Sequence, residues 1–307
     1  MKHESVLAKE VQDCLDLKKG DGVVDMTLGL GGHSLEMLKK IGKKGHLYAF
    51  ELDKKNLEEA KKRLSAYSGQ ITYINENFRY LKTRVIGNKV DAVLFDLGLS
   101  SPHVDDSERG FSFSKEGPLD MRFGTDTQLT AEDVVNTYPE VKLAEIFWKY
   151  GEERFSRKIA HFIVKRREVN RIKTTTELAE LARRAYPLKL IYKMQHHPAT
   201  KVFQALRIEV NDELTALEEA LKQSLETLKV GGRLAVISYH SLEDRIVKQF
   251  FRMMEKPPAQ GQEAIYSVSG EPLIKNLTRK PITPTREEIE ANPRSRSAKL
   301  RALIKLK

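Results

Sequence analysis

The sequence predicts an α/β fold, a doubly wound parallel sheet with a helical domain inserted into it. In the first third of the chain, short apolar runs alternate with segments of helical spacing. From 108 to 207 the strand signals stop and only helical spacing remains, and strand signals resume after that. We therefore expect a discontinuous core made of 1–107 and 208–307, with 108–207 as the inserted helical domain, a candidate for substrate recognition.

Four apolar runs in the first third are the predicted parallel strands. They cover 23–25, 46–50, 71–74 and 91–95, and helices are expected over 35–41 and 56–64. The residues at or just beyond the four strand ends are Asp25, Glu51, Phe78 and Asp96. Because such sheets bind ligands beyond the carboxyl ends of their strands, we expect all four side chains to line one crevice. Phe78 is placed either to pack on an adenine ring or to fill the core.

A glycine-dense turn follows the first strand and opens a helix, an arrangement that lets the backbone approach a nucleotide-sized ligand. Ser34 stands where a dinucleotide fingerprint needs its third glycine, and no Gly-Lys-Ser/Thr follows to make a P-loop. Glu51 lies about 20 residues beyond the turn, where a ribose-binding carboxylate is expected. This pattern favours S-adenosylmethionine, and an ordinary turn with solvated acids is the alternative.

Composition limits the class of protein. The 307 residues are 40% hydrophobic with one cysteine, which excludes a disulfide framework and a cysteine-based metal site. The first twenty residues lack an apolar signal core and no run is long enough to span a bilayer, so a cytoplasmic protein without a membrane partner is expected. The net charge of +10 suits a polyanionic partner.

The later elements are predicted from spacing and caps. Helices are expected over 130–136, 141–150, 156–167 and 176–186, with Thr130 and Thr176 as caps. A fifth strand is expected over 231–239 and a late edge strand over 299–307. The apolar-poor, proline-rich stretch 256–293 is expected to be a surface loop.

The segment 96–103 is predicted to lie at the reacting end of the crevice. Methyl transfer to an exocyclic amine needs acceptors that hold the amine N–H groups and free the nitrogen lone pair. Asp96 is the best acceptor candidate. Ser100 and Ser101 either position the base or serve only the turn.

Several blocks over nearly the whole chain resemble the bacterial ribosomal RNA small-subunit methyltransferase H family, also called MraW. They are 27–34, 96–102, 108–113, 118–122, 150–155, 197–200, 203–208, 240–245 and 292–297. The resemblance implies a Rossmann-like methyltransferase fold and a cytosine-N4 methyltransferase that uses S-adenosylmethionine. Its implied substrate is a cytidine in the decoding region of 16S ribosomal RNA, free or in the 30S subunit. A homodimer is left open.

The resemblance also implies the cofactor site. Its residues carry over to Gly31, Gly32, His33, Glu51, Phe78, Asp96 and His103. Three positions depart from the family pattern, which usually has glycine at Met26, aspartate at Glu51 and glutamine at His103. The longer acid should still reach ribose, and a histidine adds a pH dependence.

Two basic clusters are candidates for RNA contact, with solvated faces as the alternative. They consist of Arg154, Arg157, Lys158, Lys165, Arg166, Arg167, Arg171 and Lys173, and of Arg279, Lys280, Arg286, Arg294, Arg296, Lys299 and Arg301. Trp148 is expected in the core of the insert, and Asp120 with Arg122 as a buried pair bracing the insert against the sheet domain.

Three histidines, His196, His197 and His240, lack companion ligands at metal spacing, so no metal site is expected. The stretch 240–245 either borders the target base or begins a helix with an internal Glu/Asp–Arg network. Two other functions stay open, an RNA-binding assembly factor without catalysis and a methyltransferase acting on DNA or a small molecule.

Overall fold

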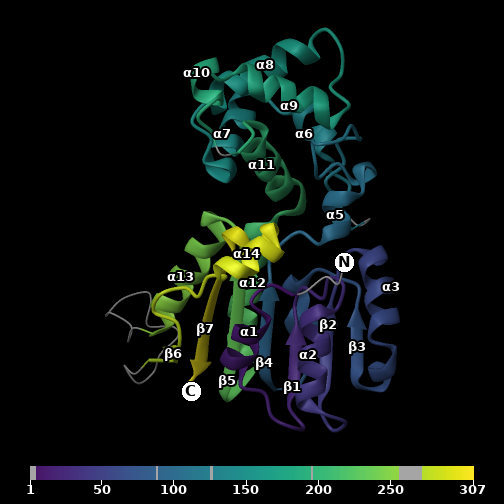
Figure 1. The fold of residues 1–307 in the computed structure, drawn as a ribbon, viewed down its shortest axis with the longest axis vertical. Helices are drawn as coiled ribbons and strands as arrows, with labels where there is room; N and C mark the ends of the chain where they lie inside the picture. Colours follow the sequence, from purple (N-terminus) through teal and green to yellow (C-terminus); the bar gives the residue numbers. More distant parts are fainter. Residues whose placement is uncertain (1–4, 88, 125–126, 195, 256–271) are drawn as a thin grey trace. The chain divides into compact units, whose positions relative to one another are not determined.

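The computed structural model describes residues 5–87, 89–124, 127–194, 196–255 and 272–307. The chain divides into two compact units, a sheet unit of Met1–Gly98 with Leu214–Lys307 and a helical unit of Leu99–Glu213 (Figure 1). The sequence placed the boundaries at 107/108 and 207/208. The second boundary lies later because helix α11 runs unbroken from Ala199 to Asn211.

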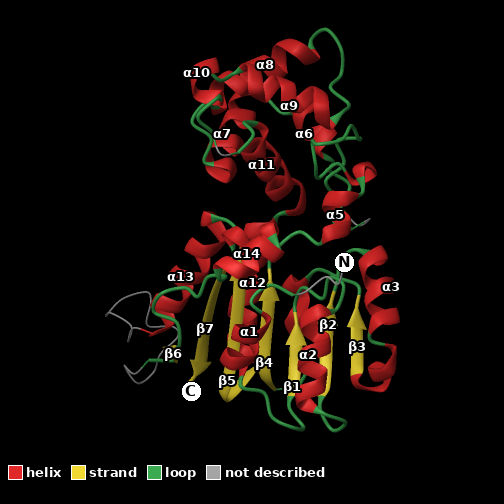
Figure 2. Cartoon of the chain, in the orientation of Figure 1, coloured by secondary structure: helices red, strands yellow, loops and turns green. Residues whose placement is uncertain are grey.

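The sheet unit contains a seven-stranded sheet in the order β3-β2-β1-β4-β5-β7-β6 (Figure 2). The strands are β1 Gly22–Asp25, β2 His46–Phe50, β3 Ile71–Ile74, β4 Val90–Asp96, β5 Leu228–Ser238, β6 Ile274–Asn276 and β7 Lys299–Lys305. The first five pair in parallel, whereas β7 runs antiparallel to both β5 and β6. This is a doubly wound, Rossmann-like sheet.

Helices cover both faces of the sheet, because its central strands are apolar on both sides. The helices of the sheet unit are α1 Ala8–Leu15, α2 Gly32–Ile41, α3 Lys54–Arg63, α4 Leu81–Arg84, α12 Glu213–Thr227, α13 Ser241–Glu255 and α14 Arg286–Ala291. One buried cluster joins the sheet to α12 and α13, and another joins its opposite face to α1, α2 and α3. Successive buried strand residues, such as Val23 and Val24, belong to opposite clusters.

Two expectations about the chain end are wrong. Strand β7 is not at the edge of the sheet, because β6 pairs with its outer side. Residues 256–271 lie outside the described residues, but the rest of the expected loop contains β6 and α14. Strand β6 forms by pairing with β7, and its Ile274 is buried in the cluster that includes the apolar face of α13.

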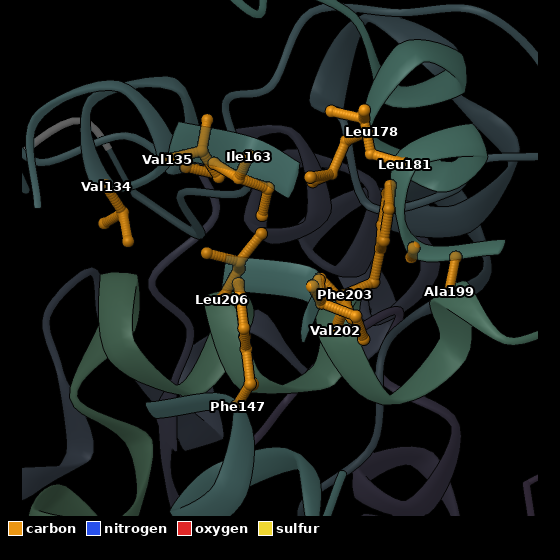
Figure 3. Close-up of a cluster of buried hydrophobic side chains, with 14 of the residues drawn as sticks. Val134, Val135, Phe147, Ile163, Leu178, Leu181, Ala199, Val202, Phe203 and Leu206 are labelled. Atoms are coloured by element: carbon orange, nitrogen blue, oxygen red, sulfur yellow. The ribbon is translucent and has the colours of Figure 1, made fainter. Parts of the chain in front are cut away.

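The helical unit buries its own apolar core (Figure 3). Its helices are α5 Ser101–Asp105, α6 Ala131–Thr137, α7 Glu140–Gly151, α8 Ser156–Arg167, α9 Thr175–Arg184, α10 Leu188–Ile191 and α11 Ala199–Asn211. Thr130 caps α6 in a reciprocal capping box with Asp133, as its sequence position predicts. The cap of α9 is Thr174 rather than Thr176, because Thr174 accepts the N–H of Glu177.

Two expectations about the insert also need correction. Trp148 is 64% exposed on α7, so it lies outside the core. Asp120 and Arg122 form a bidentate pair at 2.6 and 2.9 Å, but both side chains are about a third exposed and both belong to the helical unit. No helix in the described part of the chain is long and apolar enough to cross a membrane.

Candidate active site

The site lies where the sheet changes winding direction, at the carboxyl ends of β1 and β4. These strands are neighbours, and the chain leaves β1 toward β2 and β3 before it returns to β4. The backbone N–H of Asp96, at the end of β4, donates to Thr27 Oγ1 at 2.6 Å. This bond ties the glycine turn after β1 to the end of β4, at the position where open α/β sheets bind ligands.

The glycine turn is held in a shape that only glycine adopts freely. Gly29 and Gly31 have φ values of +53° and +76°. A Cβ on Gly31 would lie 3.1 Å from Leu64, and one on Gly32 would lie 2.1 Å from the hydroxyl of Ser5. The backbone of this turn therefore packs closely against its neighbours. The turn leads directly into α2, whose first N–H groups have no partner within the helix.

Glu51 closes the turn from the side of β2. Its Oε2 accepts the N–H of Gly29 and its Oε1 accepts the N–H of Asp53, both at 2.8 Å. Burial raises the pKa of Glu51 to about 8, against the opposing effect of these two hydrogen bonds. A carboxylate has about four acceptor sites, so two remain for ligand hydroxyls.

Asn75 fixes the backbone beside Glu51. Its side-chain amide donates to the carbonyls of Glu51 at 2.7 Å and Leu52 at 3.2 Å. The amide thus joins the end of β3 to the end of β2 and orients the peptide that carries the carboxylate.

Asp25 has a different place from the one expected. It is 1% exposed, and it accepts the Ser34 hydroxyl at 2.6 Å and the Thr27 N–H at 3.1 Å. Burial raises its pKa despite these bonds. Asp25 therefore braces the glycine turn from beneath instead of lining a crevice.

His33 stands on the first turn of α2 and faces the end of β4. Its side chain is 6% exposed. The backbone of Val6 lies close enough to favour the charged ring, but neither ring nitrogen makes a hydrogen bond of good geometry with a described residue. Its Nε2 lies 3.6 Å from Asp96 Oδ2. Burial lowers the pKa of His33, so the neutral ring is favoured. A buried polar ring without such a partner is a position that a polar ligand can satisfy.

Tyr239 holds Asp96 from the other side. Its hydroxyl donates to Asp96 Oδ1 at 2.8 Å, while the Asp96 side chain remains 25% exposed. Burial and the neighbouring carboxylate raise the pKa of Tyr239 well above its usual value, so the phenol stays a donor. A Cβ on Gly98 would lie 2.7 Å from the Tyr239 ring, so this close packing requires glycine.

The stretch after β5 begins a helix. Glu243 is 3% exposed and accepts the N–H groups of Tyr239 and His240 at 2.8 and 3.2 Å. Asp244 pairs with Arg301 of β7 at 2.7 Å, so this ion pair reaches beyond the stretch 240–245 instead of lying within it. His240 Nε2 lies 3.1 Å from Glu243, and the described residues contain no group of three ligands for a metal ion.

Phe78 and Met26 both pack on the sheet. Phe78 is half-buried and meets Phe95 edge-on with ring centroids 5.7 Å apart. Its contact with an adenine ring stays a prediction. Met26, where the family usually has glycine, is 1% exposed and packs into the sheet core.

Ser100, Ser101 and His103 belong to the helical unit. Ser100 Oγ and His103 Nδ1 are 3.0 Å apart, and His103 packs against Phe111 and Phe123 at 5.2 Å each. His103 is thereby 5% exposed. The roles of these three residues in catalysis or cofactor binding stay predictions.

Many of the expected RNA-binding cations form ion pairs or hydrogen bonds with other residues of the chain. Arg166 pairs with Glu177 at 2.5 Å, and Arg167 donates to the carbonyl of Val135 at 2.8 Å. Other internal pairs are Lys165–Glu168, Arg171–Glu132, Arg286–Glu290, Lys299–Asp244 and Arg301–Asp244. Of these paired cations, Lys165, Arg171 and Arg286 are nonetheless exposed, and the other exposed members of the two clusters are Arg154, Arg157, Lys158, Lys173, Arg279, Lys280, Arg294 and Arg296.

Sequence reasoning missed Tyr239, Asn75 and Thr27. Tyr239 and Asn75 directly follow β5 and β3, so the strand-end rule that selected Asp96 would have found them. Thr27 has no comparable signal, because a threonine in a turn is common and only the structure brings its hydroxyl to β4.

The chain matches the family described as "MraW methylase family" over residues 1–306. A curated Streptococcus dysgalactiae subsp. equisimilis protein named "Ribosomal RNA small subunit methyltransferase H" is 46% identical over 310 residues, which cover 99% of this chain and 98% of that protein.

Solved structures are similar at low identity. An rRNA methylase from Streptococcus thermophilus is 14% identical, with 97% of this chain and 95% of that chain covered and a TM-score of 0.43. The Streptococcus mutans protein SMU.1697c, solved in complex with SAH, is 13% identical, with 99% and 100% covered and a TM-score of 0.46.

Proposed function

The chain belongs to the MraW methylase family, and from this premise we propose that it methylates the N4 amine of a cytidine in small-subunit ribosomal RNA. The methyl donor is S-adenosylmethionine, and the proposed target lies in the decoding region of 16S RNA. The observation that carries the proposal is the Asp96 carboxylate, which is partly exposed beside the glycine turn and fixed by Tyr239.

The residues at the strand ends fit S-adenosylmethionine. Glu51 keeps two acceptor sites for the ribose hydroxyls, and the turn at Gly29 and Gly31 brings backbone close to a ligand. His33 offers a buried ring nitrogen to a polar group of the cofactor. When bound, the cofactor supplies an activated methyl group on its sulfonium.

The proposed task of Asp96 is to orient the target amine. The lone pair of a cytosine amine is delocalised into the ring, and an acceptor that holds one N–H turns that lone pair toward the methyl group. The Tyr239 hydroxyl donates to Asp96 Oδ1 and fixes the carboxylate, and we assign the amine to this carboxylate. Most of the acceleration then comes from in-line positioning and from stabilising the positive charge that develops on the nitrogen.

The proposed partner is the RNA itself or the assembled 30S subunit. The net charge of +10 favours a polyanion, and the helical unit carries exposed cations at Arg154, Arg157 and Lys158. We assign substrate recognition to the helical unit on this basis.

The test is methyl transfer in vitro. Purified protein with labelled S-adenosylmethionine is offered 30S subunits, free 16S RNA and DNA of the matching sequence. Nucleoside mass spectrometry should find N4-methylcytidine in RNA, and Asp96→Asn should lose it. Methylation of a ring carbon, or of DNA alone, contradicts the proposal.

A further inference from the structure

One stretch of the helical unit lacks acidic residues and has no role in the proposed site. Residues 181–208 contain no aspartate or glutamate and six lysines or arginines. Within this stretch, α10 presents Leu188 at 63% and Tyr192 at 86% exposure. These two side chains are four residues apart on a helical turn, so they share one side of it.

The start of α8 lies beside this stretch. The rings of Phe155 and Tyr186 have centroids 4.5 Å apart, and the Tyr186 hydroxyl donates to the buried carboxylate of Glu153. Glu153 also accepts the N–H of Phe155 at 2.7 Å. Tyr186 directly precedes the turn into α10, so these contacts join two basic segments of one compact unit.

We group exposed side chains of these two joined segments under the name α10 surface. It consists of Lys189, Tyr192 and Lys193 with Arg154, Arg157 and Lys158. Among the described residues, none of its five cations forms an ion pair, and Arg154 and Lys158 lie over the rings of Phe155 and Phe162. The acid next in sequence, Glu153, is buried and already bonded.

Exposed cations beside an exposed aromatic ring are what proteins use to hold single-stranded nucleic acid. Phosphates pair with the cations, and an unpaired base stacks on the ring whatever its identity. Trp148 provides a contrast within the same unit, since the residues three before it and four after it, Glu145 and Glu152, are acidic.

We infer that the α10 surface binds an unpaired segment of the RNA substrate, with a base stacked on Tyr192 and phosphates held by the surrounding cations. This inference rests on the proposed function for the identity of the polymer. It differs from the expectation based on Arg166 and Arg167, whose charges are used inside the fold.

The experiment measures binding of the full-length protein to a fluorescent single-stranded RNA of mixed sequence across a range of salt concentrations. Tyr192→Ala should weaken binding about 5- to 150-fold, whereas Tyr192→Phe keeps the ring and should retain most of the affinity. Lys189→Ala with Lys193→Ala should lower the magnitude of the salt slope by about 0.7 for each phosphate that these lysines neutralise in the parent protein.

Matched controls are Trp148→Ala, an exposed aromatic flanked by acids, and Lys142→Ala, a lysine paired with Glu145. Both should bind RNA like the parent protein. Unchanged binding in Tyr192→Ala and in the double lysine variant overturns the inference, as does an equal loss in Trp148→Ala.

A second measurement separates this inference from the proposed function. S-adenosylmethionine affinity should be unchanged in every α10-surface variant. If the parent protein methylates RNA but the α10 variants bind it normally, the surface assignment fails alone. If the parent binds no RNA and the α10 variants instead lose capture of an acidic protein, both proposals fail.

Discussion

The two units handle charge in opposite ways. In the sheet unit, Asp25 is buried and Glu51 is partly buried, and each accepts two hydrogen bonds from fixed donors. In the helical unit, Arg157, Lys189 and Lys193 lie in solvent without ion pairs among the described residues. Carboxylates held by fixed donors suit the proposed binding of a small ligand, which needs precise geometry. Exposed cations suit the proposed binding of a polyanionic polymer through its phosphates.

Because of this difference, substitutions in the two units should change different measured quantities. Changes at the strand ends should alter cofactor affinity, methyl-transfer rate and their pH dependence. Changes on the helical surface should alter RNA affinity and its salt dependence. A strand-end variant that altered only RNA affinity, or a helical-surface variant that altered cofactor affinity, would contradict this division between the two units.

The largest effect is expected for Asp96→Ala. Removing the acceptor of the target amine should lower the single-turnover methyl-transfer rate about 100-fold or more, and cofactor affinity much less. Asp91→Asn changes a carboxylate at the opposite end of β4, paired with Lys229, and should leave the rate nearly unchanged. Equal losses of rate and affinity in Asp96→Ala would make Asp96 a cofactor ligand only.

At a pH above about 8, where Glu51 is ionised, Glu51→Ala should weaken S-adenosylmethionine binding about tenfold or more, because hydrogen bonds from ribose to a charged group contribute roughly 1.5–3 kcal/mol. Calorimetry measures this directly. Glu76→Ala is a control, since Glu76 pairs with Arg84 near β3 and has no assigned ligand role. Unchanged binding in Glu51→Ala would remove Glu51 from the site.

Tyr239→Phe should lower the methyl-transfer rate about tenfold, because it deletes one hydrogen bond to the Asp96 carboxylate. A purely structural tyrosine would lower stability and leave the single-turnover rate of the folded protein unchanged.

Cofactor binding should depend on the ionisation of Glu51, whose pKa is about 8 in the free protein. The carboxylate accepts ribose hydroxyls better than the neutral acid, so affinity should rise as pH rises through about 8. The raised pKa also means that Glu51 destabilises the free protein as pH rises from its ordinary 4.5 to about 8. Glu51→Gln should lack both trends in calorimetry and in denaturation, and a parallel pH response in that variant would contradict the assignment.

The smallest effect on RNA binding is expected for Arg166→Ala with Arg167→Ala. Their partners are Glu177 and the carbonyl of Val135, so the salt slope for RNA should hardly change. Stability should fall by about 0.5–1.5 kcal/mol because the Arg167 hydrogen bond is removed, as denaturant titration can measure. A clearly weaker salt dependence of RNA binding in this variant would show that these arginines contact RNA.

Much of the sheet could be predicted from sequence because local signals and the fold agree there. Strands β2 and β3 begin and end where their apolar runs do, and Glu51 and Asp96 follow from strand ends alone. Strand β6 could not be predicted, since three residues give no periodicity and form a strand only by pairing with β7.

The burial and ion pairing of the charged residues were harder to predict, because they depend on partners distant in sequence. Asp25 and Glu51 both end strands, yet only packing shows that Asp25 is enclosed by Ser34 and Thr27. Arg166 is indistinguishable from Arg157 in sequence, and only the folded chain brings Glu177 to it. Trp148 is exposed because its helix buries the opposite face.

The most direct test of the account compares small-subunit RNA from cells that carry this gene with RNA from cells that lack it. Each RNA is digested and its methylated nucleotides are mapped by mass spectrometry. The account predicts that N4 methylation of one cytidine in the decoding region disappears without the gene, returns with the parent protein, and stays absent with Asp96→Ala. An identical methylation map in the presence and absence of the gene would contradict it.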